Sequence, residues 1–181
     1  KKIKFDLKNS SDKEILYYMS KIILNLKDQD YFRKLDALVL LGDRYETFIL
    51  SLVALVFKIK IIHLCGGSET EGSIDNIFRK FISECAYINL VETEKHKKNL
   101  LNIRNRKKIF NIGSTALENK NNLLINKKEF ERKYKIKFDN EKKIIICVFH
   151  PETFKTKKKN IIYLQSLLKF LSYKNENIIF T

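Results

Sequence analysis

Residues 37–47 read ALVLLGDRYET, and the expected class of fold can be inferred from them. Its apolar run, residues 37–41, is short and continuous and is stopped by Gly42. Such a run is typical of a strand that is buried on both faces of a parallel sheet. A helix is expected to begin near Tyr45, so the stretch predicts a strand, a polar loop and a helix in succession.

The same alternation continues on both sides of this stretch. Ser11 and Glu14 have the spacing of a capping box, and they predict a helix that begins near Asp12. The further strands expected are 59–63, 87–91 and 108–112, and the further helices expected are 75–86 and 93–101. Strands that alternate with helices in this way predict right-handed crossovers and a parallel sheet. We therefore predict that residues 1–113 form most of a Rossmann-like α/β domain.

A second α/β domain is predicted in the last part of the chain. Residues 117–141 are polar and rich in lysine, with one weak helical pattern at 128–134, and they are expected to cross between domains. The apolar run 143–149 then predicts a strand, which an amphipathic helix and a strand at 177–180 follow. The predicted organisation is 1–120 for most of the first domain, 121–141 for the connection and 142–181 for the start of the second.

Composition narrows the class of protein. The chain has 181 residues, of which 44% are hydrophobic, so it is long enough to bury a core and is expected to be globular. No run approaches the roughly 18 apolar residues that a membrane span requires, because Lys58 and Lys60 interrupt the richest stretch. Three cysteines without a C-x-x-C pair favour a reduced, cytoplasmic compartment. The chain begins at Lys1 without methionine and ends inside a strand-like run, so both ends are interpreted as cuts.

The formal net charge of +15 raises the question of a nucleic-acid partner, because lysine and arginine neutralise phosphates. The lysines, however, are spread with asparagine and isoleucine over the whole chain rather than gathered in one stripe. Tracts such as 95–108 and 155–159 are therefore interpreted as solvated surface. The sequence predicts no nucleic-acid partner.

Polar residues follow the predicted strands, at the points where a parallel sheet collects ligands. There, loops and helix amino termini present backbone N–H groups to anions. The three loops concerned are 42–47, 63–75 and 150–153. Each also has a structural interpretation: Asp43 as a helix cap, Gly66-Gly67 as a tight turn, and His63 and His150 as local packing or bonding groups. No cluster has metal-ligand spacing, and neither a metal nor a cofactor is predicted.

Taken together, four blocks resemble the hydrolysing UDP-N-acetylglucosamine 2-epimerases in order and spacing. They are residues 41–47, Gly66-Gly67 with 70–75 and Arg79, residues 111–114, and residues 149–153. The resemblance implies the two-domain glycosyltransferase type B fold, here truncated at both ends, with a nucleotide sugar held between two Rossmann-like domains. It implies conversion of UDP-N-acetylglucosamine to N-acetylmannosamine and UDP, by anti elimination of UDP and hydration at C1 and C2, for sialic or related nonulosonic acid synthesis. Because such enzymes are about twice this length, the resemblance also implies that residues 1–181 alone are inactive and that the full-length protein is a homo-oligomer.

The resemblance implies a role for each candidate residue. The reaction needs a base for the C2 proton, a stabilised leaving group, and a group that reprotonates C2 from the other face. Asp75 is the implied acid/base group, Asp43 orients the sugar or a neighbouring side chain, Arg79 fixes the loop carboxylates, and His150 faces the diphosphate. The implied catalytic residues are Asp43, Asp75 and His150, with Glu69 and Glu71 as substitutes for the base. The implied substrate-binding residues are Arg44, His63, Gly66, Gly67, Arg79 and Thr153.

Two positions depart from the pattern of many relatives. Asn76 stands where many have a second aspartate, and Cys65 stands where several have an acidic residue or a histidine. An amide cannot act as a base, and a neutral thiol replaces neither group readily. Three alternatives stay open: the same chemistry on a GDP- or UDP-linked diacetylbacillosamine-type sugar, a non-catalytic nucleotide-sugar-binding remnant, which the truncation and Asn76 favour, and a basic nucleic-acid-binding module, which rests on the net charge.

Overall fold

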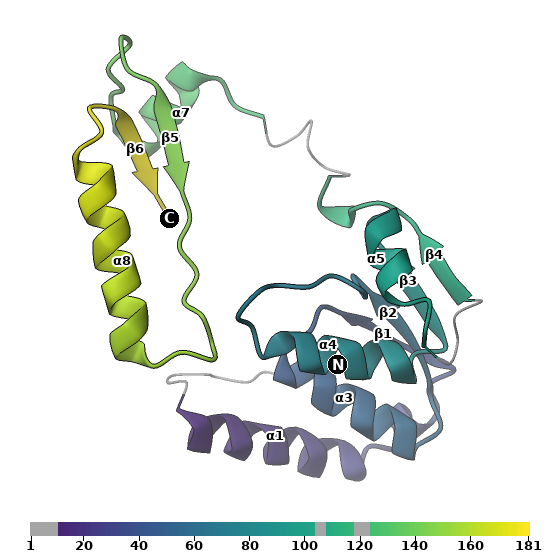
Figure 1. Ribbon diagram of the computed structural model, residues 1–181. Helices are drawn as coiled ribbons and strands as arrows, with labels where there is room; N and C mark the ends of the chain where they lie inside the picture. The colour runs from purple at the N-terminus through teal and green to yellow at the C-terminus, as the bar shows by residue number, and fades with distance from the viewer. Residues whose placement is uncertain (1–10, 104–107, 118–123) are drawn as a thin grey trace. The chain divides into compact units, whose positions relative to one another are not determined.

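The computed structural model describes residues 11–103, 108–117 and 124–181, and these residues form two compact units (Figure 1). Among them, unit 1 contains the residues up to Thr70 and Ile74–Thr115. Unit 2 contains Glu71–Ser73 and the residues from Ala116 onward. The boundary between the two units lies after Thr115. The connecting segment expected at 121–141 remains a prediction.

Unit 1 contains a four-stranded sheet whose strands are all parallel. The strands are β1 (Ala37–Leu41), β2 (Lys60–Leu64), β3 (Ile88–Val91) and β4 (Ile109–Asn111), in the spatial order β1-β2-β3-β4. Leu41 pairs with Leu64, and Leu64 pairs with Leu90, so the strands end at one common edge. The predicted α/β class with a parallel sheet is confirmed.

The helices of unit 1 connect these strands and enclose its core. They are α1 (Asp12–Lys27), α2 (Asp30–Arg33), α3 (Tyr45–Val56), α4 (Asp75–Cys85) and α5 (Glu94–Asn99). The predicted capping box opens α1, since the Ser11 hydroxyl accepts from the Glu14 backbone N–H and the Glu14 carboxylate accepts from the Ser11 backbone N–H. Helix α3 packs against both α1 and α4 (Figure 1). The core includes Leu26, Ala54, Ile61 and Ile82, each at most 1% exposed.

One face of this sheet is not covered by the helices that the structure describes in unit 1. Val39 and Leu41 on β1 are 59% and 61% exposed, and Phe110 and Ile112 at β4 are also exposed. The prediction that the first strand is buried on both faces is therefore wrong. The strand order explains the difference, because right-handed connections that always step in the same direction place their helices on the same face.

Unit 2 contains a smaller parallel sheet of two strands, β5 (Ile144–Cys147) and β6 (Asn177–Phe180). Helix α8 (Lys157–Ser172) connects them, and helix α7 (Lys127–Tyr134) precedes them. The 3-10 helix η2 (Thr115–Leu117) lies where the two units meet in the sequence. Asn177 bonds both backbone groups of Asp139, accepting from its N–H at 3.0 Å and donating to its carbonyl at 2.7 Å. These bonds join the segment after α7 to the start of β6.

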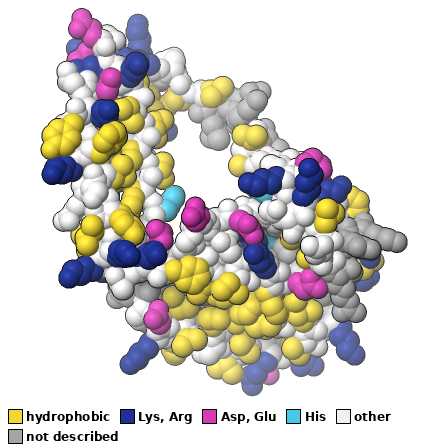
Figure 2. Space-filling view, in the orientation of Figure 1, with side chains coloured by type: hydrophobic (Ala, Val, Ile, Leu, Met, Phe, Trp, Pro, Cys, Tyr) yellow, Lys and Arg dark blue, Asp and Glu magenta, His cyan; other side chains and the backbone are white. Residues whose placement is uncertain are grey.

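Apolar side chains reach the surface on both units (Figure 2). In unit 1 they gather over α1 and α3, where Ile23 and Val56 are exposed. In unit 2 Ile146 and Val148 are exposed at and just after β5. Within the described ranges, no helix combines the length and the apolar character that crossing a membrane requires.

Candidate functional site

An ion pair between Asp43 and Arg79 lies beyond the carboxyl end of β1. Asp43 follows Gly42, whose φ of 88° turns the chain out of the strand. The Arg79 side chain comes from α4, is 8% exposed as a residue, and donates from Nη2 to Asp43 Oδ2. Burial lowers the pKa of Arg79, and the negative charge of Glu92 opposes this effect. A guanidinium remains charged even so, and Asp43 supplies the anion that a buried cation requires.

Arg79 and Asn76 together fix the loop that precedes α4. Arg79 Nη1 donates to the Ser68 carbonyl at 2.6 Å and to Asn76 Oδ1 at 2.9 Å. Asn76 Oδ1 also accepts from the Thr70 backbone N–H at 2.9 Å, and Asn76 Nδ2 donates to the Thr70 carbonyl at 2.6 Å. An ionised aspartate has no donor for that carbonyl. The amide at position 76 therefore holds the loop in a way that a carboxylate cannot.

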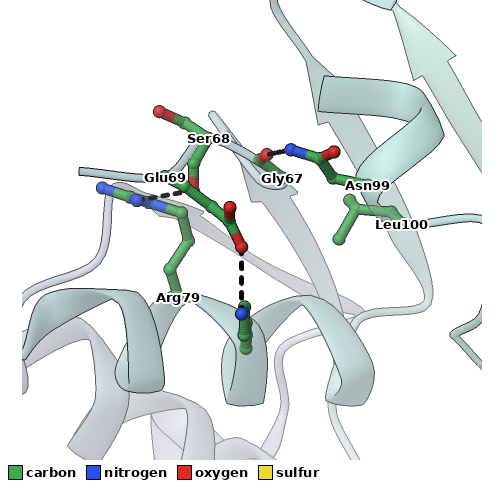
Figure 3. A pocket seen from close by; sticks show the side chains of 7 residues that line it. Gly67, Ser68, Glu69, Arg79, Asn99 and Leu100 are labelled. Atoms are coloured by element: carbon green, nitrogen blue, oxygen red, sulfur yellow. Dashed lines mark hydrogen bonds and ion pairs between the residues drawn. The ribbon is translucent and has the colours of Figure 1, made fainter. Parts of the chain in front are cut away.

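Gly66 and Gly67 form the bend after β2, and packing requires both to be glycine. Gly67 has a φ of 74°, and a Cβ there would collide with the His96 carbonyl. A Cβ at Gly66 would lie 2.9 Å from the Ser83 hydroxyl oxygen. Asn99 Nδ2 donates to the Gly67 carbonyl at 2.8 Å (Figure 3). A small pocket beside this bend is lined by Gly67, Ser68, Glu69, Arg79, Lys80, Asn99 and Leu100 (Figure 3).

His63 in β2 is fully buried and bonded at both ring nitrogens. Its Nε2 lies 2.8 Å from the Gly42 carbonyl, which can only accept, so Nε2 carries the proton. Its Nδ1 then accepts from the Ser83 hydroxyl at 3.0 Å. Burial lowers the pKa of His63, while the Gly42 carbonyl and Asn89 act in the opposite direction. The ring packs and bonds locally, and direct contact with a substrate remains a prediction that this burial disfavours.

The loop carboxylates occupy three different settings. Asp75 is the first residue of α4, where the helix dipole favours a negative charge. It lies one helical turn before Arg79, so the two share a face of the helix. Glu69 pairs with Lys80 at 2.9 Å on the surface. Glu71 is exposed and groups with unit 2. The structure thus brings Asp75, Asp43 and Arg79 to one end of unit 1.

The predicted substrate-binding residue Arg44 lies at the surface, immediately after Asp43. Its Nε bonds the Glu46 carboxylate at 3.2 Å, and its side chain is 65% exposed. It is the N-cap residue of α3, but its side chain makes no capping hydrogen bond. Its guanidinium is therefore available to solvent at the same end of the sheet.

Another carboxylate, which belongs to none of the sequence motifs, lies at the same edge. Glu92 directly follows Val91, the last residue of β3, and is half-buried. The Ser114 hydroxyl donates to Glu92 Oε1 at 2.8 Å. Burial raises the pKa of the Cys65 thiol, and the nearby Glu92 carboxylate raises it further. The criterion that selected Asp43, a polar residue just after a buried strand, would also have found Glu92.

The candidate residues of unit 2 follow β5. His150 and Thr153 are exposed, and the Thr153 backbone N–H and hydroxyl both donate to the Gly72 carbonyl, at 3.1 and 3.2 Å. Asn160 on α8 bonds both backbone groups of Glu152, accepting at 3.0 Å and donating at 2.9 Å. The loop after β5 is therefore ordered by α8.

These groups suit proton transfer and the binding of a polar or anionic ligand. Unit 1 offers carboxylates that can exchange protons, and a buried guanidinium that orders them. Across residues 11–103, 108–117 and 124–181, no group of three histidine, cysteine, aspartate or glutamate side chains is arranged to hold a metal ion.

Comparison with known proteins yields a family and several relatives. A family model described as UDP-N-acetylglucosamine 2-epimerase matches residues 1–181. A GDP/UDP-N,N'-diacetylbacillosamine 2-epimerase (hydrolyzing) of Campylobacter jejuni is 35% identical over 185 residues, which cover 100% of this chain and 47% of that protein. Polysialic acid biosynthesis protein P7 of Escherichia coli is 33% identical over 175 residues, 96% of this chain and 44% of that protein. The chain spans about half the length of the curated relatives it matches.

Solved structures share the fold. A UDP-GlcNAc 2-epimerase from Neisseria meningitidis bound to UDP-GlcNAc has a TM-score of 0.70 and 26% identity, and the match covers 96% of this chain and 49% of that one. The S. aureus MnaA-UDP co-structure has a TM-score of 0.69 at 20% identity, and the match covers 99% of this chain and 48% of that one. The predicted glycosyltransferase type B class of fold is confirmed, and the chain spans about half of it.

Proposed function

Because the chain belongs to the UDP-N-acetylglucosamine 2-epimerase family, we propose that the complete protein is a hydrolysing 2-epimerase of a nucleotide-activated N-acetylated amino sugar. The first candidate substrate is UDP-N-acetylglucosamine, which gives N-acetylmannosamine and UDP for sialic or related nonulosonic acid synthesis. The Neisseria meningitidis structure bound to UDP-GlcNAc supports this substrate, and the polysialic acid protein P7 supports this pathway. The complete protein acts in the cytoplasm as a homo-oligomer, and residues 1–181 alone do not complete the reaction.

The reaction begins with an elimination. Asp75 takes the proton from C2 of the sugar, the C–H electron pair forms a C1–C2 double bond, and the C1–O bond breaks to release UDP. Water then adds across the double bond, with its oxygen at C1 and a proton at C2. Proton transfer by a positioned carboxylate contributes about a hundredfold or more to such a step.

The main observation that supports this proposal is the set of hydrogen bonds and the ion pair that Arg79 makes. One buried guanidinium binds Asp43 after β1, the Ser68 carbonyl after β2, and Asn76 at the start of α4. The loop after β1, the loop after β2 and the start of α4 are thereby held at one end of the sheet, where parallel α/β proteins bind ligands. Asp75 lies within this ordered region and is the carboxylate proposed to act on the sugar ring.

The remaining candidates have supporting roles. We assign His63 to positioning, because its Nε2–H holds the Gly42 carbonyl next to Asp43. Gly66 and Gly67 allow the backbone bend beside the pocket of Figure 3. His150 stabilises the departing diphosphate, and Arg44 and Thr153 bind the substrate; these roles rest on the family motif and on the exposure of the three residues.

A second candidate substrate has one specific observation in its favour. The Campylobacter jejuni relative, at 35% identity, is described as a GDP/UDP-N,N'-diacetylbacillosamine 2-epimerase (hydrolyzing). The same chemistry on a GDP- or UDP-linked diacetylbacillosamine is therefore the alternative reaction. A non-catalytic nucleotide-sugar binder is the third candidate. Asn76 stands where many relatives have a second aspartate, and it favours this candidate if catalysis requires that aspartate.

Release of the nucleoside diphosphate tests these candidates. Purified complete protein is incubated separately with UDP-N-acetylglucosamine and with the GDP- and UDP-linked diacetylbacillosamine, and the free diphosphate is measured by a coupled assay. Release from the first substrate supports the proposal, and release from only the others moves the function to the alternative. If circular dichroism shows folded protein and none of the three substrates is consumed, the enzyme assignment fails.

A further inference from the structure

The hydration step of the proposed reaction needs a second proton-transfer group. Other carboxylates that follow the strands of unit 1 are paired with a cation or lie at the surface. Asp43 is ion-paired with Arg79. Glu69 is paired with Lys80 at the surface. Glu94 is exposed at the start of α5, where it accepts from the Asn111 side chain at 2.9 Å. Asn76 is an amide and cannot exchange a proton in this way.

Glu92 occupies the centre of the edge at which the four strands end. It follows β3, which lies between β2 and β4. On one side the Cys65 backbone N–H, just after β2, donates to the Leu90 carbonyl at 2.9 Å. On the other side the Ile112 backbone N–H, just after β4, donates to the Val91 carbonyl at 2.9 Å. The strand register therefore places Glu92 between the loops that follow β2 and β4.

The neighbours of Glu92, Ser114 and Cys65, position its carboxylate and do not pair it with a positive charge. The Ser114 hydroxyl donates to one of its oxygens at 2.8 Å. The Cys65 thiol has its pKa raised by burial and by the nearby charge of Glu92, so it stays neutral at physiological pH. Neither neighbour is a cation, in contrast to the pairing of Asp43 with Arg79. Glu92 nevertheless interacts electrostatically with Arg79. Burial lowers the pKa of Arg79, and the negative charge of Glu92 opposes that decrease.

We propose that Glu92 is the second proton-transfer residue of the reaction and acts in the hydration step, while Asp75 acts in the elimination step. This inference rests on the proposed function. In the hydration step the O–H bond of water breaks, its oxygen bonds to C1, and its proton passes to Glu92. C2 receives a proton from Glu92 as the double-bond electrons form the new C–H bond, so the carboxylate ends as it began.

The test separates the two halves of the reaction in the complete protein, using whichever nucleotide sugar the parental protein consumes. Diphosphate release reports the elimination, and nuclear magnetic resonance reports the unsaturated intermediate sugar and the final epimer. For Glu92→Gln we expect diphosphate release to continue, the unsaturated sugar to accumulate, and the epimer to form about a hundredfold more slowly or worse. Glu92→Asp restores part of the epimer formation. Glu94→Gln, which removes an equal charge two residues away, changes both rates by no more than a few fold.

Several outcomes overturn the inference. Epimer formation at the parental rate in Glu92→Gln excludes Glu92 from the chemistry. If the rates of diphosphate release and of epimer formation fall equally, Glu92 acts in the elimination step or stabilises the fold instead. If Glu92→Gln does not fold, Ser114→Ala decides, because loss of the hydroxyl donor must lower the ratio of epimer to released diphosphate. Failure of the parental protein to release any diphosphate is a different result, and it counts against the proposed function rather than against Glu92.

Discussion

Asn76 bonds both backbone polar groups of Thr70, accepting from its N–H at 2.9 Å and donating to its carbonyl at 2.6 Å. The same arrangement occurs where Asn160 holds Glu152 and where Asn177 holds Asp139. In each case the side-chain amide satisfies a backbone N–H and carbonyl outside the regular helices and strands. An asparagine that breaks a catalytic pattern in the sequence is thus a structural clamp in the fold.

Removal of the Asn76 amide should loosen its loop. Asn76→Ala leaves the Thr70 N–H without its acceptor, and a lost hydrogen bond of this kind costs roughly 1–2 kcal/mol. Since 1.4 kcal/mol corresponds to a factor of ten, we expect the Thr70 amide to exchange with deuterium about tenfold faster. Hydrogen exchange read by mass spectrometry measures this, with Asn102→Ala at an exposed position as the control. Unchanged exchange at Thr70 would mean that the clamp does not order the loop.

The ion pair of Asp43 with Arg79 should couple strongly, because Arg79 is buried. In a double-mutant cycle of Asp43→Asn and Arg79→Leu, we expect an interaction energy of roughly 1–3 kcal/mol in the free energy of unfolding. The matched cycle of Arg44→Leu and Glu46→Gln tests a pair whose arginine side chain is 65% exposed, for which we expect under about 1 kcal/mol. Urea unfolding gives both values, and equal coupling in the two cycles would contradict the role given to burial.

His63 should stay neutral in the folded protein and make stability depend on pH. Because burial lowers its pKa below the ordinary value of 6.5, the unfolded chain binds more protons than the folded one below that pH. The contribution of His63 is therefore fully present above about pH 6.5 and is lost as the pH falls, by at most about 1.4 kcal/mol per pH unit. Titration by nuclear magnetic resonance should show a His63 midpoint below 6.5 and a proton on Nε2. A midpoint at or above 6.5 excludes this account.

Asp75 and Glu69 can be separated by paired variants. Asp75→Asn should reduce turnover by about a hundredfold or more, because the amide cannot accept the C2 proton. UDP affinity, measured by calorimetry, should stay within a few fold, since the carboxylate acts on the sugar ring. Glu69→Gln, which removes only a surface partner of Lys80, should leave turnover nearly unchanged. The reverse pattern would identify Glu69 as the base.

Local rules predicted much of the fold from sequence. The spacing of Ser11 and Glu14 predicted the capping box, and the short apolar runs predicted the parallel strands. The exposed face of β1 could not be predicted, because burial depends on the order of the strands and on the side to which their helices cross. A strand such as 37–41 has the same residues whether one face or both are covered.

The candidate site was predicted in part. Motif positions led to Asp43, Arg79 and Asp75, and the structure brings these three to one end of unit 1. Glu92 directly follows a strand as Asp43 does, but it lies in none of the four motif blocks and was therefore missed. Its contacts with Cys65 and Ser114 could not be predicted, because these residues meet it only through the strand register. The clamp made by Asn76 could also not be predicted from the sequence, since it depends on the path of the loop at Thr70.

Deuterium incorporation shows whether the protein acts by elimination followed by hydration. The complete protein is incubated with UDP-N-acetylglucosamine in deuterium oxide, and the products are read by proton nuclear magnetic resonance and mass spectrometry. Elimination followed by hydration predicts equal amounts of UDP and N-acetylmannosamine, with one deuterium at C2 of the sugar, because the proton taken by the enzyme exchanges with solvent. N-acetylglucosamine released with its original hydrogen at C2 would show simple hydrolysis of the sugar–phosphate bond, and it would contradict the assignment of this protein as a hydrolysing 2-epimerase.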